Sequence, residues 1–132
     1  MKLPFATPTL HAQFFADKNF TAFMTEREIY EASGNLKIRV PLTEEGEKIL
    51  KTVGKMGEGI IREIAKVEGV EMFVPYKPDI LVVHAKEGAD WEKMMPAILD
   101  IIDKREVSLK DGEPTHAEDW NVLTRLASKE EK

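Results

Sequence analysis

Apolar and polar residues alternate in two short stretches near the N-terminus, a pattern typical of paired β-strands. The stretches are residues 10–16 ("LHAQFFA") and 20–25 ("FTAFMT"), separated by Asp17, Lys18 and Asn19. Asparagine tolerates a positive φ better than a branched residue does. We therefore expect a β-hairpin whose connection ends with Asn19 at a positive φ.

A third alternating stretch, "LKIRV" at residues 36–40, predicts a strand, and a helical repeat follows it. Thr43 is placed to cap a helix predicted over residues 44–67. The apolar stripe of this helix consists of Ile49, Val53, Met56, Ile60, Ile64 and Val67. Three glycines between residues 54 and 59 each disfavour a helix interior, so we expect a bend or a break there.

Two more strands are predicted after this helix. Gly69 is a candidate left-handed C-cap, and "VEMFV" at 70–74 starts an extended segment. Residues 80–83 in "DILVVHA" are continuously apolar, as expected of a central strand. We expect "PYKP" at 75–78 to form a tight turn between the two strands.

A second helix is predicted over residues 91–104, with Asp90 as its N-cap. Its apolar face consists of Trp91, Met94, Met95, Ile98 and Ile102. Pro96 lies past the first turn, so either the helix start is frayed or the helix is kinked at Pro96. Thr115 and Glu118 stand in capping-box register ahead of a short C-terminal helix with an apolar stripe, Trp120, Leu123, Leu126 and Ala127.

These elements predict an α+β fold: a two-layer sandwich of a mostly antiparallel sheet with two main helices on one face, plus the short C-terminal helix. The 132 residues fit a single domain, 1–132. The chain has 42% hydrophobic and 33% charged residues, which is ordinary for a globular protein.

Charge and composition exclude several function classes. The formal net charge is -5, and the sequence has no run rich in lysine and arginine, so we expect no nucleic-acid partner. No stretch approaches the roughly 18 apolar residues of a membrane span, and prolines interrupt the N-terminal "MKLPFATPTL". We expect a cytoplasmic protein without a membrane partner.

The residue types that carry most chemistry are scarce. The chain has no cysteine, so it offers no thiolate for catalysis, zinc or an iron–sulfur cluster, and we expect no cofactor. The three histidines, His11, His84 and His116, lack metal-ligand spacing. His84 could line a pocket, although a structural role is the more common one. No serine lies in a nucleophile elbow, and we expect no enzymatic activity.

Two further patterns have a functional and a structural interpretation. "GKMGEGIIR" contains three glycines but no complete phosphate-binding motif, which favours packing of a bent helix. Trp91, Met72, Met94 and Met95 could form an adaptable binding surface, but helical spacing favours a role in the core.

Residues 60–104 resemble the N-terminal domain of Nfu/NifU-type iron–sulfur scaffold proteins. The resemblance lies in "VEGV" at 67–70, Asp79 in "PDILVV", Lys86, and "ADWEKMMP" at 89–96. It extends loosely to a core of about 7–104 and leaves 105–132 as a C-terminal extension. The segment from Val70 to Asp79 is one residue longer than in the family, and the C-x-x-C domain that holds the cluster is absent from this chain.

The resemblance implies a non-enzymatic accessory domain that docks on a cluster-bearing scaffold or target protein, as a monomer or weak homodimer. It points to Glu68, Asp79, Asp90 and Trp91 as candidate binding residues. Turn and cap roles are the alternatives for Asp79 and Asp90. The alternative function is a ferredoxin-like regulatory module that binds a small ligand or dimerises through an edge strand such as 36–40.

Overall fold

The computed structural model describes residues 11–15, 19–34, 36–105 and 107–111. The short helix predicted behind the capping box of Thr115 and Glu118 lies outside these residues, and so does His116. Within them, five strands form one sheet in the order β1-β2-β5-β4-β3, and every neighbouring pair is antiparallel. The strands are β1 (Ala12–Phe15), β2 (Phe20–Met24), β3 (Ile38–Arg39), β4 (Val70–Lys77) and β5 (Ile80–Ala85).

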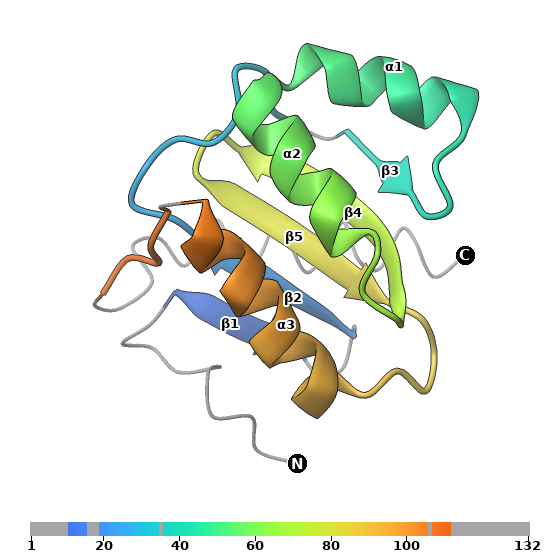
Figure 1. Cartoon of the computed structure of the whole chain (residues 1–132), viewed down its shortest axis with the longest axis vertical. Helices are drawn as coiled ribbons and strands as arrows, with labels where there is room; N and C mark the ends of the chain where they lie inside the picture. The colour runs from blue at the N-terminus through green and yellow to red at the C-terminus, as the bar shows by residue number, and fades with distance from the viewer. Residues whose placement is uncertain (1–10, 16–18, 35, 106, 112–132) are drawn as a thin grey trace.

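Three helices cover one face of this sheet: α1 (Glu44–Thr52), α2 (Lys55–Ile64) and α3 (Trp91–Lys104) (Figure 1). The two-layer α+β arrangement with an antiparallel sheet is confirmed. The predicted N-terminal helix is two helices, because the chain breaks at Gly54, whose φ of 98° is outside the helical range. Thr43 caps α1 as expected, and its Oγ1 accepts a hydrogen bond of 3.1 Å from Gly46 N.

The N-terminal hairpin is also confirmed. Ala12 pairs with Phe23, Phe15 pairs with Phe20, and Asn19 has a φ of 57°. The strand predicted over 36–40 is shorter than expected, since only Ile38 and Arg39 pair with β4. Val40 N still donates to Glu71 O, but Pro41 follows and has no amide hydrogen to continue the ladder.

The turn predicted at 75–78 was wrong in its extent. β4 continues through Pro75 and Tyr76 to Lys77, and only Pro78 and Asp79 connect it to β5. The register shifts between Pro75 and Lys77, which is an irregularity of the kind that allows a proline within a sheet.

The main core lies between the sheet and the helices. It includes Phe23, Phe73, Leu81 and Val83 from the sheet and the apolar stripes of α2 and α3. α3 begins at Trp91 and includes Pro96, so the start of the helix is not frayed. The predicted apolar face of α3 is buried: Trp91, Met94, Met95, Ile98 and Ile102.

Glycines let the helices approach their neighbours. A Cβ added to Gly57 in α2 would lie 2.5 Å from Tyr30 Cδ1 and 3.0 Å from Ile29 O. One added to Gly59 would meet the guanidinium group of Arg105 at 2.9 Å. These contacts support packing as the role of the glycines in "GKMGEGIIR".

Candidate functional site

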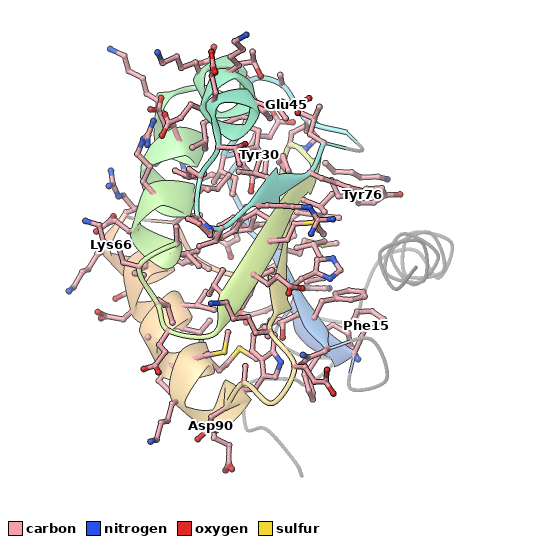
Figure 2. The ribbon with its side chains drawn as sticks, turned by 90° about the vertical axis from the view of Figure 1, so that its right-hand side faces the viewer. Phe15, Tyr30, Glu45, Lys66, Tyr76 and Asp90 are labelled. Atoms are coloured by element: carbon pink, nitrogen blue, oxygen red, sulfur yellow. The ribbon has the colours of Figure 1, made fainter. Side chains whose placement is uncertain are left out.

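Two loops at one end of the sheet border an open depression of about 510 Å³. One is the turn between α2 and β4, residues 65–69, and the other is the loop between β5 and α3, residues 86–90 (Figure 1). Figure 2 places Asp90 at this end of the molecule, where α3 begins. The depression is lined by Val67, Glu68, Gly69, Lys86, Glu87, Gly88, Ala89, Asp90, Lys93 and Met94.

Gly69 joins the two loops closely. Its φ is 100°, and a Cβ at this position would lie 2.9 Å from Met94 Sδ and 3.1 Å from Ala89 Cβ. The carbonyl of Gly69 accepts a hydrogen bond of 2.7 Å from Lys86 N. Glycine is needed here for the backbone conformation and for the close contact with α3. The predicted capping role is wrong, since α2 ends at Ile64 with Ala65 as its C-cap.

Asn19 anchors the β5–α3 loop from the other side. Its Nδ2 donates hydrogen bonds of 3.0 Å to the carbonyls of Ala85 and Lys86. Its Oδ1 accepts a hydrogen bond of 2.8 Å from Trp91 Nε1. One side chain therefore holds both the end of β5 and the start of α3. The sequence marks Asn19 only as a turn residue, because its partners lie 66 to 72 residues away.

The structure brings two of the four predicted binding residues together. Glu68 and Asp90 are both exposed at the depression. Asp90 is also the N-cap of α3, as expected, and its Oδ1 accepts a hydrogen bond from Glu92 N. Trp91 follows directly, but it is only 2% exposed and packs on Phe14, with 5.6 Å between the ring centroids. Its ring therefore belongs to the core.

Asp79 lies at the opposite end of β5, in the turn that precedes the strand. Its carboxylate pairs with Lys110 Nζ at 2.6 Å. Its carbonyl accepts a hydrogen bond of 2.8 Å from Thr25 N. Asp79 thus connects the β4–β5 turn to β2 and to the residues after α3, and it is remote from the depression.

The charges around the depression are of both signs. Glu68, Glu87 and Asp90 are acidic, Lys86 and Lys93 are basic, and all five are exposed. Such side chains can pair with complementary charges of another molecule and keep most of their hydration until contact. The depression is open to solvent, so its charged side chains can contact a broad surface of another molecule.

The two described histidines lie elsewhere. His84 is on β5 and 6% exposed, and its ring lies 5.0 Å from that of Phe20. His11 is also buried, and its Nδ1 lies 2.9 Å from Lys110 O. Among the residues that the structure describes, no three histidine, aspartate or glutamate side chains are grouped so that they could hold a metal ion. Across the same ranges, no helix is long and apolar enough to cross a membrane.

No family model matches this chain, and no curated protein matches it. Among solved structures, it is similar to the solution NMR structure of a NifU-like protein from Saccharomyces cerevisiae. The two have a TM-score of 0.48 and 16% sequence identity, and the match covers 79% of this chain and 84% of the other. The match does not assign a function to this chain.

Proposed function

We propose that this chain is a non-enzymatic accessory domain that binds a protein partner through the depression between the α2–β4 turn and the β5–α3 loop. One observation carries the proposal: exposed charged residues stand on two loops held in place by Gly69 and Asn19. Loops that are fixed before binding lose little conformational entropy when a partner docks.

An iron–sulfur scaffold or target protein is the partner that we propose. Its choice rests on the sequence resemblance, and the depression contains several of the residues that carry this resemblance. These are Val67, Glu68 and Gly69 of "VEGV", Lys86, and Asp90 and Met94 of "ADWEKMMP". The cluster would be the cargo of the partner, since this chain has no cysteine to bind it.

The test is an NMR titration of the ¹⁵N-labelled full chain with a separate C-x-x-C scaffold domain, both without and with its cluster. Chemical shift changes confined to residues 67–70 and 86–94 would support the proposal. Unchanged spectra at high partner concentration would contradict it and favour the small-ligand alternative, which the same spectra can examine with a metabolite mixture.

A matched pair of charge reversals locates the binding surface. Glu87→Lys changes a charge at the depression, and Asp103→Lys makes the same change at the opposite end of α3, where Asp103 is exposed. We expect Glu87→Lys to change the affinity by roughly twofold to fivefold, the size of an exposed ion pair, and Asp103→Lys to leave it unchanged. Equal effects of the two variants would show a general charge effect and no binding at the depression.

A further inference from the structure

The sheet face opposite the three helices carries an apolar cluster, with His84 of β5, Gln13 of β1 and Arg39 of β3 on the same face. Seven side chains form a cluster there, which we call the second sheet face: Phe20, Ala22, Met24, Met72, Val74, Ile80 and Val82. Phe15 and Tyr76 pack against it, and Figure 2 shows both residues on the side of the sheet away from α2 and α3. All seven are at most 3% exposed, although α1, α2 and α3 lie on the other face.

The described part of the chain ends beside this face. Leu109 forms an isolated bridge with Thr25, and Lys110 N donates a hydrogen bond of 3.1 Å to Met24 O. Lys110 also pairs with Asp79, the residue before Ile80. Met24 and Ile80 pair with each other at one end of the second sheet face. The residues after 111 therefore start next to the cluster.

The sequence of those residues matches the face in pattern and in length. A helix over 115–127 would carry Trp120, Leu123 and Leu126 on one side and Asn121 and Arg125 on the other. It would be about 20 Å long at 1.5 Å per residue. A strand of the length of β5 also spans about 17–20 Å. The intervening "GEP" reaches about 10 Å, which is close to the separation of packed layers.

We propose that the C-terminal segment, residues 112–132, packs as an amphipathic helix on the second sheet face, with the side chains of Trp120, Leu123 and Leu126 against the cluster. A short helix alone is marginal in water, and a bare apolar face of this size is rare on a monomer. Each therefore stabilises the other. This inference is independent of the proposed function, because the second sheet face is separate from the depression.

The direct test is a set of NOE measurements on the unmodified full chain with labelled methyl groups. We expect NOEs from the Trp120 indole protons to the methyl groups of Met72, Val74 or Val82. NOEs from these methyl groups to residues 1–10 in place of Trp120 would overturn the proposal. Intermolecular NOEs in a sample mixed from labelled and unlabelled chains would show a second copy on this face and would overturn it as well.

Two variants of the full chain add an independent readout. Leu123→Asp introduces a charge on the apolar side of the segment, and Asn121→Asp introduces the same charge on the polar side. We expect Leu123→Asp to shift the methyl signals of Val74 and Val82 and to raise the binding of a hydrophobic dye severalfold. The signal of Ile60, in the core under the helices, reports that the variant is folded. Asn121→Asp should change none of these, and the same response from both variants would contradict the proposal.

Discussion

Asn19 and Trp91 are 72 residues apart in the chain, and Asn19 Oδ1 accepts a hydrogen bond of 2.8 Å from Trp91 Nε1. This bond connects the turn of the N-terminal hairpin to the first residue of α3. Trp91 is buried, so its indole nitrogen depends on this partner. The positions of the β5–α3 loop and of the depression thus depend on an asparagine in another part of the chain.

Replacement of Asn19 tests this anchor. Asn19→Gly keeps the positive φ without strain but loses the hydrogen bonds, and we expect it to lower the free energy of unfolding by about 1–3 kcal/mol. Asn19→Ala should cost about 1 kcal/mol more, because alanine adopts a positive φ less readily. Urea denaturation measures both. Trp91→Phe removes the indole nitrogen that donates this bond. If Asn19→Gly then costs as much in the Trp91→Phe variant as in the native chain, the bond to the indole contributes nothing to stability.

Trp91→Ala measures how far the ring is part of the core. The ring is buried and contacts Phe14, so we expect a loss of roughly 3–5 kcal/mol in the free energy of unfolding. Thermal or urea denaturation checks this value. A nearly unchanged melting curve would instead mean that the ring packs loosely in solution and is available for an interface.

Alanine substitutions at two helix glycines, Gly57 and Gly46, should change the stability of the protein in opposite directions. At Gly57, the added Cβ would lie 2.5 Å from Tyr30 Cδ1, and we expect a cost of about 1–3 kcal/mol from overpacking. At Gly46, the nearest atom is 3.5 Å away, so alanine should stabilise the protein by about 0.5–1 kcal/mol through its helix propensity. Denaturation of the two variants side by side gives the comparison. Stabilisation by Gly57→Ala would contradict the packing of α2 on Tyr30.

The hydroxyl group of Tyr30 is buried and has no hydrogen-bond partner among the residues that the structure describes. Tyr30→Phe should therefore leave stability unchanged or raise it by up to about 1 kcal/mol. Burial also raises the pKa of Tyr30 well above its usual 10.0. The unfolded chain then ionises first, so the stability that Tyr30 contributes is present below pH 10 and is lost as the pH rises above it.

Urea denaturation of the native chain and of Tyr30→Phe between pH 8 and pH 11 measures this loss of stability. The native chain should lose stability more steeply above about pH 10 than the variant, in line with the ordinary pKa of tyrosine. Parallel curves would show that the hydroxyl group is hydrated in solution.

Most of the secondary structure follows from the sequence, because local rules apply along a strand or a helix. The strand predicted from residues 20–25, the capping by Thr43 and Asp90, and the apolar face of α3 are all present in the structure. The errors are in places where distant residues compete with local preference. Pro75 suggested a turn, yet the pairing of β4 with β5 continues past it through an irregularity. Gly69 suggested a helix cap, yet its role is to let the side chains of Met94 and Ala89 pack closely against the backbone, where a Cβ would clash.

The residue types at the candidate site were also accessible from the sequence, but their arrangement was not. The resemblance selected Glu68, Asp79, Asp90 and Trp91 with equal weight. β5 runs between Asp79 and the loop that contains Asp90, so the two residues lie at opposite ends of the sheet, and the packing of α3 buries Trp91. By itself, the sequence determined the elements and the absence of thiolate chemistry, because these depend on neighbours along the chain and on composition. Only the tertiary structure decided which loops meet, because Asn19 and Gly69 act on partners that the sequence places far away.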